Sequence, residues 1–161
     1  ADPGEFPGPL ERVGIIGVSL GAASAVLANP KPAPDAVIVE SMYPTIEEAV
    51  ADRLVMRLGP LGASLVTPLL WQMSLRTGVR AQDLRPIQHL PRLGAPVLIV
   101  SGTEDKHTTW AKTQRLFDSA VEPKELWRVE GAAHVDLHAF QPEEYERRIL
   151  RFLAKHLRNG A

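Results

Sequence analysis

Apolar residues follow two alternating patterns along the chain: short continuous runs, and longer segments with helical spacing. Continuous runs rich in β-branched residues indicate strands that are buried on both faces of a sheet. We interpret four such runs as strands, at residues 13–18, 36–40, 96–100 and 125–129. Helical segments separate the strands and follow the last one. This alternation predicts an α/β fold, in which a mostly parallel sheet of about four strands has helices on both faces.

The longest stretch between two predicted strands, at about 43–90, is expected to be a helical, cap-like insertion. Its first helix should begin where Thr45 and Glu48 have the spacing of a capping box. A second helix is expected over 63–77, and it is apolar on more than one side. Its apolar residues, Trp71 among them, either cover an acyl-binding pocket or belong to the core.

Composition excludes several classes of protein. The 161 residues suffice for one domain, and 18 basic against 19 acidic residues give a formal net charge of −1. That balance predicts no nucleic-acid partner. We see no continuous apolar run long enough to span a membrane and no export signal, so a cytoplasmic location is the default expectation. The chain has no cysteine, which excludes disulfides and thiolate metal sites.

Residues 1–9 are rich in proline and glycine, and we interpret them as a disordered remnant of cloning.

The clearest chemical motif is Gly-Val-Ser-Leu-Gly at residues 17–21, of the form G-x-S-x-G. It falls where the first predicted strand must turn sharply into a helix, as in a nucleophile elbow. Side chains at Gly17 and Gly21 would collide with the neighbouring strand or helix, and the turn would present Ser19 above the sheet. The alternative is a tight turn of small residues in which the serine is incidental.

A serine hydroxyl becomes a good nucleophile only when a base removes its proton and a third group orients that base. Of the five histidines, His134 alone directly follows a predicted strand, through a Gly-Ala-Ala turn. Asp105 lies in the corresponding loop after the preceding strand. Because parallel strands end at one edge of the sheet, Ser19, Asp105 and His134 can meet there. They also occur in the α/β-hydrolase order of Ser, Asp and His.

These motifs, together with Pro-Val-Leu-Ile-Val-Ser-Gly-Thr-Glu-Asp at residues 96–105, resemble the α/β-hydrolase superfamily, in its bem46-like and serine-aminopeptidase-like branch. The resemblance covers the part of that fold from the nucleophile strand onward, so residues 10–161 would form a partial, truncated α/β-hydrolase domain. It implies Ser19 as nucleophile, Asp105 as triad acid and His134 as general base. It also implies the Leu20 backbone N–H as one oxyanion donor. Ala133 departs from the family, which usually has glycine there.

The same resemblance implies that roughly half of the fold is absent, because only eighteen residues precede Ser19. The upstream loop that would supply a second oxyanion donor is then missing. The nucleophile strand would also have an unpaired edge. We therefore expect a homo-oligomer or swapped dimer that covers this open sheet edge.

Other polar residues have competing interpretations. Glu104 could replace Asp105 as the acid, although a solvated loop charge fits its position better. His107 is expected to be exposed, and Ser41 either lines the pocket or belongs to a plain turn. His134, Asp136 and His138 offer metal-ligand types at alternating positions, but no further ligand cluster accompanies them, so no metal is expected.

The sequence thus predicts a serine hydrolase that acts on a small-molecule ester, thioester or amide without a cofactor. The alternative is a non-catalytic fragment or interaction module that retains the triad residues. A third interpretation has Gly17 and Gly21 cradling a phosphate at a helix N-terminus. It lacks the full G-x-G-x-x-G fingerprint.

Overall fold

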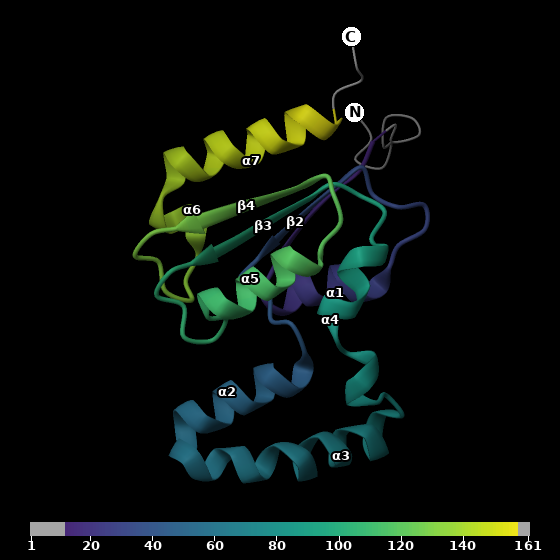
Figure 1. The fold of residues 1–161 in the computed structure, drawn as a ribbon, viewed down its shortest axis with the longest axis vertical. Coiled ribbons are helices and arrows are strands. Elements are labelled where there is room, and N and C mark those ends of the chain that lie inside the picture. The colour runs from purple at the N-terminus through teal and green to yellow at the C-terminus, as the bar shows by residue number, and fades with distance from the viewer. Residues whose placement is uncertain (1–11, 158–161) are drawn as a thin grey trace, which may run out of the picture.

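The computed structural model describes residues 12–157 and contains one sheet of four parallel strands (Figure 1). The strands are β1 (Gly14–Val18), β2 (Ala36–Glu40), β3 (Val97–Gly102) and β4 (Lys124–Val129), and they lie side by side in that order. All three pairings are parallel, so every strand ends at the same edge. The predicted α/β fold class is confirmed. Residues 1–9, which we interpret as a remnant of cloning, lie outside the described part of the chain.

Helices cover both faces of the sheet (Figure 1). One face carries α1 (Leu20–Ala28), α4 (Pro86–His89) and α5 (Trp110–Ser119), and the other carries α6 (Leu137–Phe140) and α7 (Pro142–Leu157). Successive residues of a strand point to opposite faces. The two cores reflect this alternation: Val37, Val39, Val97 and Ile99 pack on the α1 side, and Ala36, Ile38, Leu98 and Val100 pack on the α7 side.

Strand β1 differs from the prediction that it is buried on both faces. It pairs with β2 alone among the described residues, so its other edge is open, as expected from the sequence. Ile16 and Val18 are 48% and 51% exposed, so the helices within residues 12–157 leave them partly uncovered. The apolar run correctly identified the strand but not the exposure of its side chains.

The predicted insertion is a hairpin of two helices, α2 (Ile46–Leu58) and α3 (Val66–Thr77), joined by the 3₁₀ segment Gly59–Leu65. Shorter 3₁₀ turns at Ala81–Asp83 and Leu90–Arg92 flank α4. The capping box is present, since the Glu48 N–H donates to Thr45 Oγ1 at 3.1 Å. In Figure 1 the hairpin projects beyond the layer of α1, α4 and α5.

The helical stretch Ile46–Thr77 meets the length and composition of a membrane-spanning helix, and only 11% of its most apolar window is buried. From the sequence alone we expected no continuous apolar run long enough to span a membrane. The structure bends the stretch at Gly59–Leu65, so its arms have 13 and 12 residues. At about 1.5 Å per residue each arm is roughly 20 Å long, shorter than the roughly 30 Å of a bilayer core.

Candidate active site

Two of the three predicted catalytic residues meet at the carboxyl edge of the sheet. Asp105 lies in the loop after β3, and His134 lies in the loop after β4. His134 Nδ1 is 2.7 Å from Asp105 Oδ2. The Asp105 side chain is fully buried, and that of His134 is 25% exposed. If Asp105 is ionised, it accepts the Nδ1 proton and leaves the Nε2 lone pair of His134 free to act as a base.

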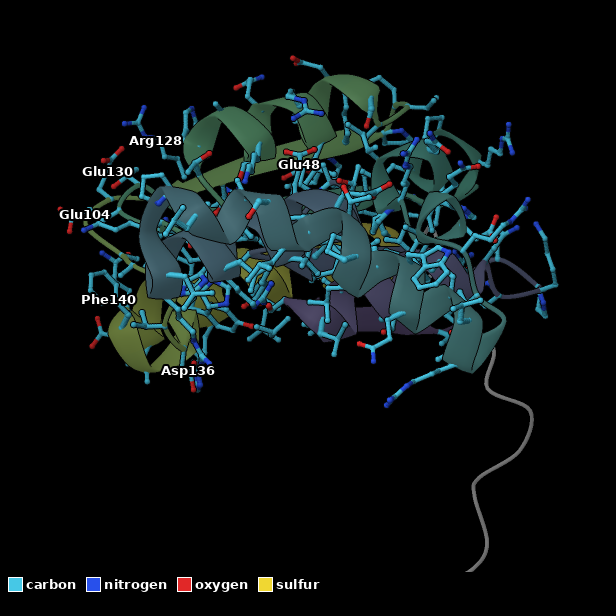
Figure 2. All side chains as sticks on the ribbon, turned by 90° about the horizontal axis from the view of Figure 1, so that it is seen from below. Glu48, Glu104, Arg128, Glu130, Asp136 and Phe140 are labelled. Carbon is cyan, nitrogen blue, oxygen red and sulfur yellow. The ribbon has the colours of Figure 1, made fainter. Side chains whose placement is uncertain are left out.

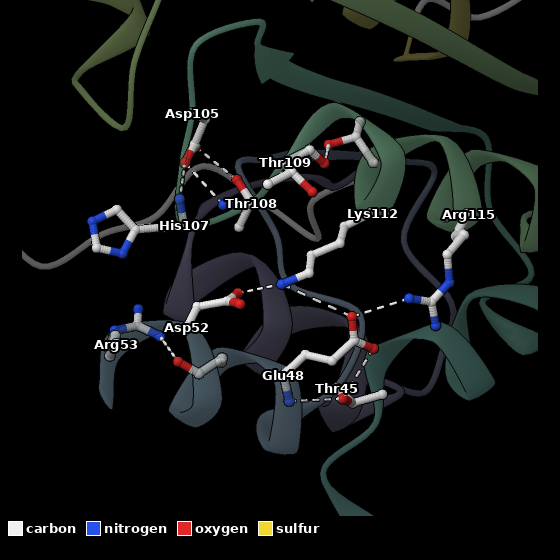
Figure 3. A network of polar contacts seen from close by, with 12 residues as sticks. Thr45, Glu48, Asp52, Arg53, Asp105, His107, Thr108, Thr109, Lys112 and Arg115 are labelled. Atoms are coloured by element: carbon white, nitrogen blue, oxygen red, sulfur yellow. Dashed lines mark hydrogen bonds and ion pairs between the residues drawn. The ribbon is translucent and has the colours of Figure 1, made fainter. Parts of the chain in front are cut away.

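Asp105 is held by donors from its own loop as well (Figure 3). Its Oδ1 accepts from the N–H groups of His107 and Thr108, both at 2.8 Å, and its Oδ2 accepts from Thr108 Oγ1 at 2.6 Å. Burial alone would raise the pKa of Asp105. The hydrogen bonds from Thr108 and His134 outweigh it and hold the pKa below its usual value. The site thus contains a carboxylate that stays charged although it is buried.

The loops that carry Asp105 and His134 touch through their backbones. A Cβ at Gly102 would lie 2.1 Å from the Ala132 carbonyl oxygen, so only glycine allows this approach. The Glu104 N–H donates to the same oxygen at 2.9 Å. Ala133 does not have a positive φ, so the alanine in place of the family's glycine introduces no backbone strain. The roles of Gly102 and Thr108 were not predicted from the sequence, although residues 105–108 have the Asp-x-x-Thr spacing typical of a loop capped by a side chain.

Ser19 lies in a sharp turn between β1 and α1. Its φ of 50° and ψ of −111° are strained for a residue other than glycine, as a nucleophile elbow requires. The Ser19 N–H donates to the Glu40 carbonyl at 2.8 Å, which ties the turn to the end of β2. A Cβ at Gly17 would lie 2.6 Å from Ala22 Cα, so the predicted need for glycine there agrees with the structure.

The structure corrects the prediction that a side chain at Gly21, the second glycine of the motif, would collide with its neighbours. A Cβ at this position would meet no atom within 4 Å among the described residues. Gly21 is exposed, in the first turn of α1. No contact within residues 12–157 therefore requires a glycine at position 21.

No hydrogen bond joins the Ser19 hydroxyl to His134 within residues 12–157, and Ser19 is half-buried. A cavity of about 370 Å³ lies between Val18, which precedes Ser19, and His134. No hairpin residue lines this cavity. Trp71 is 66% exposed, so the interpretation of that residue as core is wrong.

The same cavity contains a buried carboxyl group. Glu40 is 2% exposed and accepts a hydrogen bond at Oε1 from the Tyr145 hydroxyl at 2.5 Å. Burial raises the pKa of Glu40, although the bond from Tyr145 acts in the opposite direction. Ser41 also lines the cavity, and its hydroxyl is buried without a hydrogen-bond partner in the described chain. Its positive φ of 46° places it at a turn as well, so both interpretations of Ser41 apply.

The remaining candidates have other surroundings. Glu104 is exposed, and it is Asp105 that contacts His134. His107 was expected to be exposed but is half-buried, with its ring centroid 4.8 Å from that of His134. Asp136 caps α6 by accepting from Ala139 N–H, and Figure 2 places Asp136 and Glu104 at the same end of the molecule. Residues 12–157 contain no cluster of three or more groups suited to a metal ion.

No protein-family model matches the chain. It is similar to the uncharacterized protein YqkD of Bacillus subtilis, with 26% identity over 144 residues. That alignment covers 88% of this chain and 47% of YqkD. The alpha/beta hydrolase domain-containing protein 17B of Xenopus laevis is 34% identical over 73 residues, which cover 45% of this chain and 25% of that protein. The chain thus spans at most about half the length of these curated relatives.

Solved structures show the same fold. The esterase Pf2001 of Pyrococcus furiosus superposes with a TM-score of 0.68 at 20% identity, covering 91% of this chain and 55% of the esterase. A monoacylglycerol lipase of Paleococcus ferrophilus superposes with a TM-score of 0.61 at 22% identity, covering 91% of this chain and 69% of the lipase. The chain therefore has the fold of the α/β-hydrolase superfamily, as its four parallel strands, the surrounding helices and these superpositions show. It corresponds to roughly half to two thirds of the length of these neighbours.

Proposed function

We propose that the chain is a serine hydrolase that cleaves a small-molecule ester, thioester or amide through an acyl-enzyme. The observation that carries this proposal is the Asp105–His134 hydrogen bond, formed at the sheet edge where the strained turn at Ser19 also lies. A buried carboxylate that fixes the tautomer of a half-exposed imidazole is the arrangement that activates a serine. The esterase and lipase among the structural neighbours support hydrolysis as the reaction class.

The proposed roles follow from the atoms at the site. Ser19 Oγ attacks the carbonyl carbon while His134 Nε2 takes the hydroxyl proton, and Asp105 stabilises the imidazolium through Nδ1–H. His134 then returns the proton to the leaving group. Water, deprotonated by the same nitrogen, releases the acid and regenerates Ser19. The N–H of Leu20, the first residue of α1, has no backbone acceptor among the described residues and is available to the oxyanion.

A non-catalytic fragment is the competing proposal. It is favoured by the absence of a hydrogen bond between Ser19 and His134 and by the open edge of β1. Loss of one oxyanion donor typically lowers a rate by about 10²–10³. The resemblance implies a second oxyanion donor in a loop upstream of Ser19. Without that donor, hydrolysis would be slower by about this factor.

Turnover of a series of chromogenic esters, thioesters and amides tests the proposal. We expect the 161-residue chain to hydrolyse at least one of them. Ser19→Ala should reduce kcat by about 10³-fold or more. Ser24→Ala is the matched control, because Ser24 lies in α1, directly after the turn that carries Ser19, and its hydroxyl donates to the Leu20 carbonyl. A folded wild-type chain with no turnover above that of Ser19→Ala would favour the fragment.

A further inference from the structure

The hairpin of α2 and α3 exposes apolar side chains that the fold does not use. Leu61 is 79% exposed, and Trp71 and Leu75 are each 66% exposed. Leu58, Leu65 and Leu69 are also exposed. Soluble domains rarely leave so many large apolar side chains together on one element unless the surface binds something.

The exposed leucines and tryptophan of α3 are on its outward face. Trp71 and Leu75 are one turn apart on α3. Leu69 is four residues after Leu65, the last residue of the preceding 3₁₀ segment, and all four side chains are exposed. Leu70, on the inward face, is 8% exposed. A helix on the surface of a soluble protein normally presents polar residues to water, so the outward face of α3 has the opposite character.

The base of the hairpin is attached to the body by charged groups (Figure 3). Glu48 pairs with Arg115 at 3.0 Å, and Asp52 contacts Lys112, both cations being on α5. The acidic residues of α2 are thus already paired within this chain. The apolar outward face takes no part in this attachment.

Charge is segregated along the hairpin in a way that indicates what the apolar surface binds. From residue 53 to residue 82 there is no Asp or Glu, and the four charged side chains are all arginines: Arg53, Arg57, Arg76 and Arg80. Arg80 pairs with Asp83. No ion pair joins Arg57 or Arg76 to a carboxylate within residues 12–157. The chain as a whole has a net charge of −1, so this segment is a local basic region.

We propose that the hairpin docks the protein on the surface of an anionic phospholipid bilayer, with α3 lying along the interface. Exposed Trp and Leu side chains together with arginines are the composition of helices that lie in the headgroup region. A shallow groove of about 470 Å³, lined by Leu54, Leu65, Leu69 and Trp71 among others, can accept acyl chains. Neither arm is long enough to span the bilayer, so the attachment is peripheral.

Co-sedimentation of the 161-residue chain with vesicles tests this proposal without substrate, so its outcome is independent of hydrolysis. We expect binding to vesicles of phosphatidylserine and phosphatidylcholine and much weaker binding to phosphatidylcholine alone. The pair Trp71→Ser and Leu75→Ser should weaken binding by about tenfold or more, as should the pair Arg57→Glu and Arg76→Glu. All four positions are exposed, and circular dichroism verifies folding.

Matched controls lie on α7, across the sheet from the hairpin. Leu150 is 62% exposed and Arg151 is also exposed, so Leu150→Ser and Arg151→Glu repeat the chemical changes and should leave binding unchanged. Wild-type protein that stays in the supernatant would overturn the proposal. So would equal loss of binding in the α7 variants, or a hairpin-dependent dimer that does not bind vesicles, which would assign the surface to a second copy.

Discussion

Asp105 is the residue on which the candidate site depends most. It accepts four hydrogen bonds, from the His107 and Thr108 N–H groups, from Thr108 Oγ1 and from His134 Nδ1. Because these donors stabilise the charged form, the pKa of Asp105 is lowered despite its burial. Thr108 therefore acts on His134 indirectly, by keeping its partner ionised.

Thr108→Val should reveal this role. It removes the 2.6 Å bond to Asp105, so the pKa of Asp105 should rise and the free energy of unfolding at neutral pH should fall by about 1–3 kcal/mol. Because the pKa of Asp105 is lowered by folding, its ionised form stabilises the fold at pH values above 3.8, the ordinary pKa of an aspartate. This stabilisation is lost as the pH falls through the lower pKa of the folded state. The difference between wild type and variant, measured by urea unfolding, should therefore shrink below about pH 4.

Thr109→Val is the control, because Thr109 is exposed and its side chain makes no capping bond to α5. Equal stability of Thr108→Val and Thr109→Val at neutral pH would show that the Thr108 hydroxyl does not support Asp105.

Glu40 has the opposite pH dependence. Burial raises its pKa, so its contribution to stability is present below its unfolded pKa and is lost as the pH rises through the folded value. Glu40→Gln keeps an acceptor for Tyr145 without the charge. We expect it to equal or exceed the wild type in unfolding free energy at neutral pH, with any gain disappearing in acid. Glu130→Gln, at an exposed side chain, should change little. A Glu40→Gln variant destabilised by more than about 1 kcal/mol at neutral pH would contradict this account.

At the scale of elements, the turn from β1 to α1 gives a sharp contrast between two glycines. Gly17→Ala would place a Cβ 2.6 Å from Ala22 Cα, so it should destabilise the protein by about 1–3 kcal/mol and disrupt the turn at Ser19. Gly21→Ala meets open space in a helix and should be neutral or stabilising by up to about 1 kcal/mol. Thermal unfolding of both variants measures the contrast, and similar losses for the two would show that the turn is packed differently.

Sequence pattern predicted the elements well because the strands β2 and β3 are buried on both faces and helices end at residues such as Asn29 and Gly59. It also placed Asp105 and His134 together, since both follow strands of one parallel sheet. It could not show that β1 is half-exposed or that His107 is half-buried. Both depend on which elements cover a position in three dimensions, and periodicity along the chain does not contain that information.

At the scale of the whole molecule, the open edge of β1 carries the largest consequence. Within residues 12–157 no strand pairs with this edge, and the side chains of Ile16, Val18 and Leu20 are exposed, the last of them by 63%. An apolar, unpaired edge of this kind favours pairing with another strand. We therefore propose that the chain self-associates through this edge or by exchanging elements with a second copy.

Light scattering after size-exclusion chromatography measures this association. The wild type should have at least the mass of a dimer, and Ile16→Lys should shift it toward the monomer by placing a charge on the edge. Val121→Lys, at a site that is 58% exposed and outside the sheet, should leave the mass unchanged. A wild type that stays monomeric as its concentration rises would refute association through β1.

We propose that His134, oriented by Asp105, activates Ser19. Labelling with a fluorophosphonate, followed by peptide mass spectrometry, tests it most directly because the probe reacts with an activated serine even when turnover is slow. We expect a phosphonate adduct on Ser19, formed at a rate that falls by about 10³-fold or more in His134→Ala. A folded wild-type chain that carries no adduct on Ser19, or one labelled equally fast without His134, would contradict it.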